Sequence, residues 1–218
     1  PSARSKESVL KHFPQSEGKI SVVKECAGTG FYRRPRVEID DVQEFCGLKG
    51  REYILYVGNF NPHKNITGLI NSYLNLPAGL SGRYDLVVVA KKSGKEFNHI
   101  NKRIHFIDFL AEDRLAALYS GAGLFVFPSF IEGFGLPPVE AMACGCPVAS
   151  SNAAPMPEIL GDACLYFDPK KTDEITSAMV KALSDNNLRK VLSEAGIRQS
   201  SSYNIRRNTE EMLGVLEA

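Results

Sequence analysis

The sequence lacks an excess of charge of one sign and any long apolar run. It holds 26 basic against 25 acidic residues in 218, a formal net charge of +1. This balance gives no reason to expect a nucleic acid or a strongly anionic membrane as partner, and the short basic clusters at 33–36 and 91–92 read as solvated surface. No apolar run approaches the roughly 18 to 20 residues that span a bilayer, and no signal peptide is visible.

Cysteine is present, but without the spacing of a metal site or of a paired disulfide framework. The five cysteines are an odd number, at positions 26, 46, 144, 146 and 164. Cys144 and Cys146 are separated by one glycine and accompanied by no histidine cluster, whereas zinc sites use two to four intervening residues. We therefore expect no metal, free thiols buried in a reducing compartment, and a tight buried turn at Cys144–Cys146 instead of a nucleophile.

The first fifty residues differ from the rest. They contain a helix candidate at Lys6–Phe13, a strand candidate at Lys19–Lys24, an irregular stretch rich in Gly, Pro and Arg, and one or two helical turns at Asp40–Phe45. This segment is too small to form its own core, so it must pack on the remainder or on something missing. Because the first residue is Pro instead of Met, we expect a fragment or a processed product.

From residue 52 onward, short apolar runs alternate with helical segments. Strands are predicted at Tyr53–Val57, Leu86–Ala90, Ile104–Ile107, Leu124–Phe127, Val148–Ala149 and Leu165–Phe167. Helices are predicted at about 64–76, 111–120, 136–144, 156–160 and 172–184, followed by Val191–Gln199 and Ile205–Leu216. Continuous apolar strands separated by helices indicate an α/β, doubly wound parallel sheet. In such a sheet ligands bind beyond the carboxyl ends of the strands, so the loops there are the candidate site.

The first such loop runs from Gly58 to Asn65, directly after a strand. Gly58 permits close approach of the backbone to a ligand, and Lys64 is predicted to open a helix, where it can place a charge on a phosphate. The alternative is an ordinary turn with a surface lysine. The loop is not a Walker phosphate-binding loop, because the glycine run and the Lys-Ser/Thr pair are absent.

The second loop covers 128–138 and contains the sequence EGFGLPP from Glu132. Two prolines suit the first turn of a helix, which leaves the amides of Phe134, Gly135 and Leu136 free to face a ligand. Glu132 and Glu140 can converge on one site, where a carboxylate suits a ribose diol. Glu140 has an alternative explanation, since a glutamate near a helix N-terminus complements the helix dipole; Glu132 has no obvious structural task.

The third loop and the histidines give weaker evidence of a functional site. The third loop, 150–158, offers small polar residues, and its Glu158 reads best as the start of a helix. The four histidines, His12, His63, His99 and His105, show neither metal spacing nor a Ser or Cys partner. Only His63 lies in a loop with a predicted function.

The stretch LAALYSGAGLFVFPSFIEGFGLPPVEAMACGCPVASSNAAPMPEILGDACLYFDP, residues 115–169, closely resembles the C-terminal domain of group 1 (family four) glycosyltransferases of the GT-B fold. The resemblance covers about three quarters of the chain, from Tyr53–Asn65 to the terminal helices. It implies a donor site for a nucleoside-diphosphate sugar, used with retention of configuration and without a required metal or other cofactor. It also implies charge stabilisation of the departing diphosphate.

The resemblance also assigns roles to residues. Glu132 would lie near the donor sugar as the catalytic residue, and Glu140 would hold the ribose. The remaining donor-binding positions are Gly58, Asn59, His63 and Lys64 near the phosphates, Phe109 and Leu110 near the base, and the amides of Phe134, Gly135 and Leu136.

Two departures from the family pattern bear on the donor. Many relatives carry an arginine where this chain has Asn59 or His63, and often a glycine where it has Asp108. Diphosphate binding is therefore expected to depend more on Lys64 and on helix dipoles, or else to be weak.

A GT-B enzyme has a second, N-terminal domain that binds the acceptor. Residues 1–24 (with SKESVLKHFPQSEGKISVV) resemble only the tail of that domain, and Ile205–Leu216 resembles the helix that crosses back to it. We therefore predict that 1–50 is this tail plus an interdomain linker and that 51–218 is the donor-binding domain. The chain would be an isolated half, transferring sugar poorly or not at all.

The predicted function is sugar transfer to a glycan or lipid-linked acceptor in polysaccharide biosynthesis, in the cytoplasm or at the cytoplasmic face of the membrane. The P-x-K-N sequence at Pro62–Asn65 is typical of mannosyltransferases, which favours GDP-mannose slightly over a UDP-sugar. The alternative is a non-catalytic module that keeps the fold and serves a partner domain. A GT-B epimerase or phosphorylase is disfavoured because those families lack the EGFGLP context.

Overall fold

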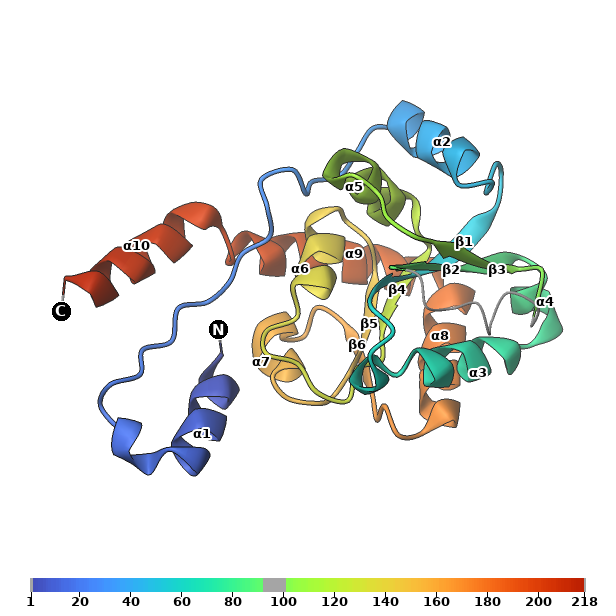
Figure 1. Ribbon diagram of the computed structural model, residues 1–218. Coiled ribbons are helices and arrows are strands. Elements are labelled where there is room, and N and C mark those ends of the chain that lie inside the picture. Colours follow the sequence, from blue (N-terminus) through green and yellow to red (C-terminus); the bar gives the residue numbers. More distant parts are fainter. Residues whose placement is uncertain (1, 92–100, 218) are drawn as a thin grey trace.

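A single parallel sheet organises the chain. The computed structural model describes residues 2–91 and 101–217, and its six strands lie in the order β3-β2-β1-β4-β5-β6 (Figure 1). Every paired neighbour is parallel. The strands are β1 (Glu52–Gly58), β2 (Tyr84–Ala90), β3 (Ile104–Ile107), β4 (Leu124–Phe127), β5 (Val148–Ser151) and β6 (Leu165–Phe167). The predicted α/β, doubly wound class is confirmed, with the strand order reversing between β1 and β4.

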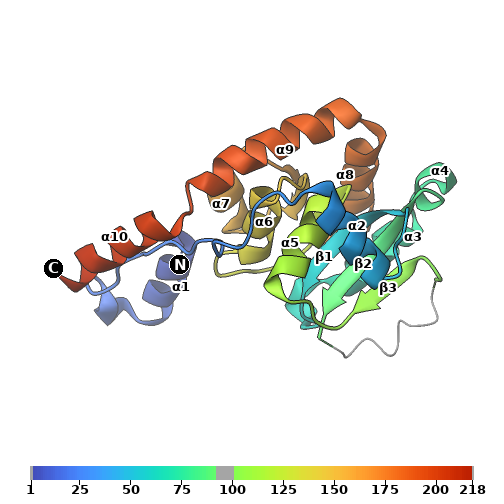
Figure 2. The ribbon, with the colours of Figure 1, turned by 90° about the horizontal axis from the view of Figure 1, so that it is seen from above.

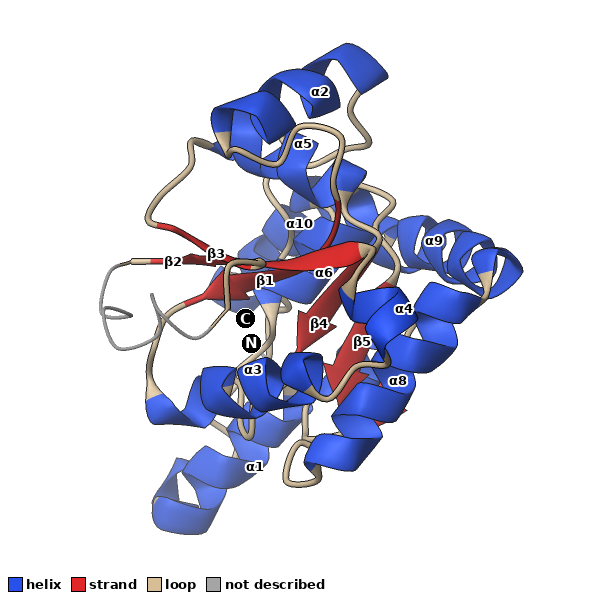
Figure 3. Cartoon of the chain, turned by 90° about the vertical axis from the view of Figure 1, so that its right-hand side faces the viewer, coloured by secondary structure: helices blue, strands red, loops and turns tan. Residues whose placement is uncertain are grey.

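Helices cover both faces of this sheet (Figure 3). One face carries α2 (Arg36–Phe45), α5 (Glu112–Gly121), α6 (Leu136–Ala143), α7 (Met156–Leu160) and α9 (Asn186–Ser201). The other carries α3 (Ile66–Leu74) and α8 (Thr172–Ser184), with the short α4 (Ala78–Ser81) beside them. Of the described helices, none is long and apolar enough to cross a membrane.

Each strand contributes to two separate cores because successive side chains point to opposite faces. In β1, Tyr53 and Leu55 pack in the cluster under α5 and α6, while Ile54 and Tyr56 pack in the cluster under α3 and α8. All four side chains are fully buried. Burial on both faces explains why the strands appear in the sequence as continuous apolar runs.

The remaining elements lie to one side of the sheet. Helix α1 (Ala3–His12), the single turn η1 (Pro14–Ser16), the segment 17–27 and helix α10 (Ile205–Leu216) all lie beyond α6 and α7 (Figures 1 and 2). No residue of α1 or α10 is buried. Neither α1 nor α10 therefore contributes to the two cores, whereas Cys26 and Ala27, at the end of the segment, pack against the core under α5 and α6.

The strand predicted at Lys19–Lys24 is wrong. The segment is extended from residue 20 onward, but it pairs with no strand among those described. Its end lies instead against α10, where the Lys24 amide donates to Glu211 Oε2 at 3.4 Å and Asn208 donates to the Lys24 carbonyl. An apolar run becomes a strand only when a neighbour accepts its backbone hydrogen bonds, which a local pattern cannot guarantee.

Several boundaries also differ from those predicted. Helix α2 begins at Arg36, earlier than the predicted turn at Asp40, and α9 extends the predicted 191–199 helix to Asn186–Ser201. Asp185 caps α9 by accepting from the Leu188 amide at 2.9 Å, a helix start that the apolar pattern did not reveal. Helix α4 was not predicted at all. The other predicted strands and helices are present.

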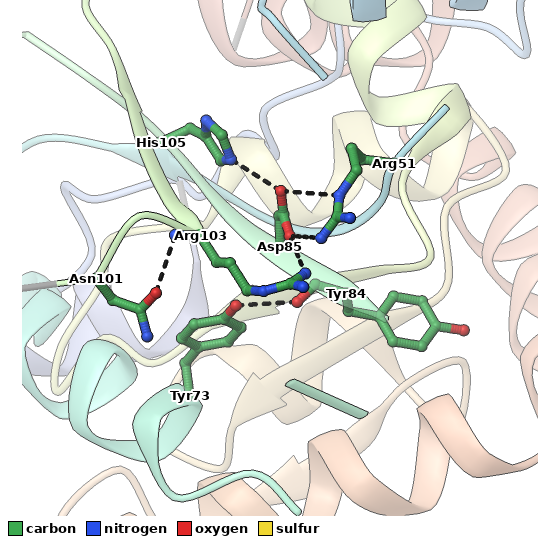
Figure 4. A network of polar contacts seen from close by, with 7 residues as sticks. All are labelled: Arg51, Tyr73, Tyr84, Asp85, Asn101, Arg103 and His105. Carbon is green, nitrogen blue, oxygen red and sulfur yellow. Dashed lines mark hydrogen bonds and ion pairs between the residues drawn. The ribbon is translucent and has the colours of Figure 1, made fainter. Parts of the chain in front are cut away.

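A buried carboxylate ties the amino-terminal ends of β1, β2 and β3 together (Figure 4). Asp85 is 5% exposed and accepts from Arg51 at 2.6 Å, from Arg103 at 3.1 Å and from the His105 ring at 2.9 Å. Arg51 and Arg103 directly precede β1 and β3, so one carboxylate fixes three strand ends at the edge opposite the candidate site. Charge-assisted hydrogen bonds of this kind are the stronger ones.

We expect Asp85→Asn to lower the free energy of unfolding by about 2 kcal/mol, because it removes several charge-assisted hydrogen bonds. The loss stays moderate because the two arginines are more than a third exposed and can return to water. Glu52→Gln, at the exposed Glu52–Arg83 pair on the same edge, is the matched control and should change stability by no more than about 0.5 kcal/mol. Urea denaturation of both variants measures this, and equal losses would contradict the special role of Asp85.

Candidate functional site

The reversal of strand order brings two loops together at the carboxyl ends of β1 and β4. The Phe130 amide donates to the His63 carbonyl at 2.8 Å, and Asn65 Nδ2 donates to the carbonyls of Pro128 and Pro169 at 3.2 and 2.8 Å. Asn65 adopts a left-handed conformation with φ 54°, which asparagine tolerates better than most residues. The first two loops predicted from the sequence are thus bound to one another at this edge.

An ion pair lies at the centre of this junction. Lys64 Nζ is 2.6 Å from Glu132 Oε1, and the two side chains are only 14% and 12% exposed. The same ammonium lies 5.5 Å from the centre of the Phe127 ring. Lys64 does not open a helix as predicted: it ends the short 3₁₀ turn η2 (Pro62–Lys64), and α3 begins at Ile66 after the left-handed Asn65.

The backbone from Gly133 to Leu136 is held by buried side chains. Phe134 is buried and packs edge-on against Tyr203, with ring centres 5.5 Å apart. Gly135 has φ 99°, and a Cβ atom there would lie 2.6 Å from Met156 Cε, so only glycine fits without strain. Within the described residues, the amides of Phe134, Gly135 and Leu136 donate no hydrogen bond. Three adjacent unbonded donors at the start of a helix are groups of the kind that bind an anion.

Glu140 lies one turn further along α6 and is partly buried. Its Oε2 accepts from the Tyr119 hydroxyl at 3.1 Å. Burial raises the pKa of the Glu140 carboxyl, and the charge of Glu112 adds to this, while the Tyr119 hydrogen bond opposes it. Burial, with the Glu140 charge, raises the pKa of Tyr119 strongly in turn. Glu140 therefore makes a specific hydrogen bond with Tyr119, in addition to any interaction with the dipole of α6.

Backbone groups make most of the contacts of the remaining residues in the first loop. A Cβ on Gly58 would lie 2.4 Å from the Tyr56 hydroxyl, which itself donates to the Asn59 carbonyl at 3.2 Å. Burial and the nearby charge of Glu132 raise the pKa of Tyr56. The Asn59 side chain accepts from the Asn61 amide at 3.1 Å, and the His63 carbonyl holds the second loop.

Phe109 and Leu110 follow β3 and differ in exposure. The Phe109 side chain is 83% exposed, whereas Leu110 is buried in the core under α5. Only the backbone of Leu110 could therefore meet a ligand. A contact between these residues and a base stays a prediction.

Sequence reasoning missed a contact between α1 and the second loop. The hydroxyls of Ser2 and Ser5 both donate to the Gly133 carbonyl, at 2.8 and 3.1 Å. The Ala3 amide donates to Glu158 Oε1 at 3.4 Å, so Glu158 starts a helix as predicted and also binds α1. A cavity of about 620 Å³ lies between α1 and residues 130–132. These partners are more than 120 residues apart, and no local pattern signals them.

The cysteines and histidines form no site in the part of the chain that the structure describes. All five cysteines are free, and Cys144, Cys146 and Cys164 are buried. Burial raises the pKa of Cys144 and of Cys164 to about 12, so these thiols are poor nucleophiles. Cys144–Cys146 forms the predicted turn, with Gly145 at φ 74°. No group of three potential ligands could hold a metal among these residues; Lys92 and His99 lie outside them.

Comparison with known proteins assigns the chain to a family. The profile described as "Glycosyl transferases group 1" matches residues 40–199. The O-antigen chain mannosyltransferase B of Escherichia coli is 31% identical over 207 residues, covering 91% of this chain and 54% of that protein. A serotype-specific mannosyltransferase WbdA of Escherichia coli is 38% identical over 162 residues, covering 70% of this chain and 20% of that protein.

Solved structures agree on the fold. Anabaena HepE, in complex with UDP and glucose, superposes with a TM-score of 0.83 at 17% identity, covering 97% of this chain and 61% of that one. The chain belongs to the group 1 glycosyltransferases and has a GT-B-type Rossmann-like domain. It spans about half the length of the first of these curated relatives and a fifth of the second.

The raised pKa of Glu140 predicts a specific pH dependence of stability. Because the folded protein binds this proton more tightly than the unfolded chain, wild-type stability falls as pH rises from the ordinary glutamate pKa of about 4.3 through the raised pKa of Glu140. Glu140→Gln keeps an acceptor for Tyr119 and removes the buried charge. Its stability relative to wild type should therefore increase across that window and then level off.

Urea denaturation at a series of pH values measures this difference. Glu194→Gln, an exposed glutamate in α9, controls for the change in net charge. A Glu140→Gln variant that loses stability relative to wild type as pH rises would contradict the assignment.

Proposed function

We propose that this chain carries the donor site of a retaining glycosyltransferase, binding GDP-mannose in preference to a UDP-sugar. The observation that carries the proposal is the Lys64–Glu132 pair, which is largely buried between two joined loops; Glu132 precedes the first of three unbonded amides by two residues. A lysine and free helix-start amides suit a diphosphate, and a carboxylate suits sugar hydroxyls. The preference for mannose is supported by the mannosyltransferase relatives.

The proposed roles follow from these positions. The ammonium of Lys64 and the amides of Phe134, Gly135 and Leu136 bind the diphosphate and the sugar, with Gly58, Asn59 and His63 bordering the phosphates. Glu140 holds the ribose, and Phe109 and the backbone of Leu110 border the base. No metal is required in this arrangement because protein donors carry the charge.

The ion pair suggests how donor binding changes the site. In the free chain Lys64 and Glu132 compensate one another's charge. When a donor binds, its diphosphate replaces Glu132 as the partner of Lys64, and the Glu132 carboxylate becomes free to interact with the sugar. In transfer, the bond from the anomeric carbon to the diphosphate oxygen breaks, and the acceptor hydroxyl attacks that carbon from the same face. The diphosphate leaves with its electron pair, stabilised by Lys64 and the amides, and accepts the proton of the hydroxyl.

The whole protein would act on a glycan or lipid-linked acceptor in polysaccharide biosynthesis. We propose that residues 1–50 are the tail and linker of an N-terminal domain and that 51–218 are the donor domain. Exposed apolar side chains of α1 and α10, including Val9, Met212, Leu213 and Leu216, support a further partner surface there. The chain without that domain would transfer poorly. A location in the cytoplasm or at the cytoplasmic membrane face stays a prediction.

A non-catalytic nucleotide-binding module is the second candidate, favoured by Asn59 and His63 where many relatives carry arginine. The intact Glu132 and Glu140 favour the enzyme. Sugar transfer by the protein joined to its N-terminal domain, compared with its Glu132→Ala variant, separates the two.

Nucleotide binding by the chain itself is the test of the donor site. Thermal unfolding with GDP, UDP, ADP and their sugars should show stabilisation of about 2.7 kcal/mol at 100 times the dissociation constant, with guanine nucleotides binding most tightly. Lys64→Ala should weaken binding by roughly ten- to a hundred-fold, since it removes a charge-assisted hydrogen bond.

Lys190→Ala, at an exposed lysine of α9, is the matched control and should bind as wild type does. Absence of stabilisation by any nucleotide at millimolar concentration would overturn the proposed donor site.

A further inference from the structure

The N-terminal turn of α1 donates two hydrogen bonds to one carbonyl of the second loop. Ser2 Oγ, fully buried, donates to the Gly133 oxygen at 2.8 Å, and Ser5 Oγ donates to the same oxygen at 3.1 Å. Ser2 also caps α1 by accepting from the Ser5 amide at 3.1 Å. Two hydroxyls from one helix turn therefore converge on a single acceptor 128 or more residues away.

Hydrogen bonds to the Gly133 carbonyl oxygen also orient the N–H group of the next residue. In a planar trans peptide, the carbonyl of one residue and the amide of the next point in opposite directions. The Gly133 carbonyl and the Phe134 N–H belong to the same unit, so hydroxyls that hold the oxygen on one side fix the N–H toward the other side. This N–H is the first of the three unbonded amides at the start of α6.

Without the hydroxyls this peptide would be less constrained. Gly133 is exposed and, lacking a Cβ, has wide conformational freedom. On its carboxyl side the unit is anchored by the buried Phe134 ring against Tyr203. The hydroxyls supply the constraint on the other side of the unit.

These two hydrogen bonds are also the main polar attachment of α1 to the sheet domain. Besides Ser2 and Ser5, the Ala3 amide donates to Glu158 at 3.4 Å, so a single helix turn bridges the loop that follows β4 and the first turn of α7. The remainder of α1 has no buried residue. Figure 1 shows the helix reaching the body near α7 by its N-terminal end, while its far end leads into the segment 17–27.

We infer that Ser2 and Ser5 are positioning residues of the donor site: by holding the Gly133 carbonyl they aim the Phe134 amide at the donor, so that the site is complete only when α1 is docked. The inference rests on the proposed function, since it gives the amide a donor to bind. It adds a contribution from the N-terminal segment that is independent of any acceptor.

The test uses the present chain and GDP or UDP as probe, with dissociation constants from titration calorimetry. Ser5→Ala leaves the Ser2 cap of α1 in place, and we expect it to weaken binding several-fold. The Ser2→Ala/Ser5→Ala double variant should weaken binding roughly ten-fold, the effect of one misdirected hydrogen bond. Ser5→Thr, which restores a hydroxyl, should recover most of the wild-type affinity.

The controls separate this inference from the function on which it rests. Ser21→Ala, an exposed serine in the extended segment, should bind as wild type, and thermal unfolding of each variant excludes general unfolding. Tight binding by wild type and by the double variant alike would overturn the positioning role and leave the donor site standing. Failure of wild type to bind any nucleotide would overturn the proposed function and the positioning role with it.

Discussion

The reversal of strand order between β1 and β4 determines where the candidate functional residues lie. Since these strands are neighbours, the loops that leave their carboxyl ends must run side by side, and the main-chain bond from Phe130 to His63 joins them. Both loops then have to place polar groups in a confined space. The Lys64–Glu132 pair satisfies this requirement, because each charge is the partner of the other and both side chains are largely buried.

Such a pair contributes little to stability, because the cost of removing two charges from water offsets most of their attraction. The pair is important in the proposed function because Lys64 can exchange Glu132 for another anionic partner. A diphosphate offers Lys64 a stronger partner and leaves a carboxylate free beside the sugar, while the amides of residues 134–136 receive the remaining charge. Asp85, at the opposite edge of the sheet, is different: it accepts hydrogen bonds from Arg51, Arg103 and His105 and so joins strand ends where no ligand is proposed to bind.

The sequence predicted what depends on local pattern. Runs such as Leu124–Phe127 are buried on both faces and therefore identified themselves as strands, and the glycines and prolines after Glu132 located the start of α6. The apolar pattern of Lys19–Lys24 predicts a strand, but its own residues cannot tell whether a neighbouring strand is there to pair with it, and none among those described does. The start of α3 was misplaced because the left-handed Asn65 ends one turn and begins another. The contacts of Ser2 with Gly133 and of Asp85 with Arg51 depend on tertiary proximity, which carries no signature in the chain.

The most direct test of the proposed donor site is an amide map of nucleotide binding. In a nuclear magnetic resonance titration of the ¹⁵N-labelled chain with GDP-mannose, the largest shifts should fall on the amides of Phe134, Gly135 and Leu136 and on the loop ending at Lys64. Shifts concentrated elsewhere, with these amides unmoved while the nucleotide binds, would contradict a donor site at the β1–β4 junction.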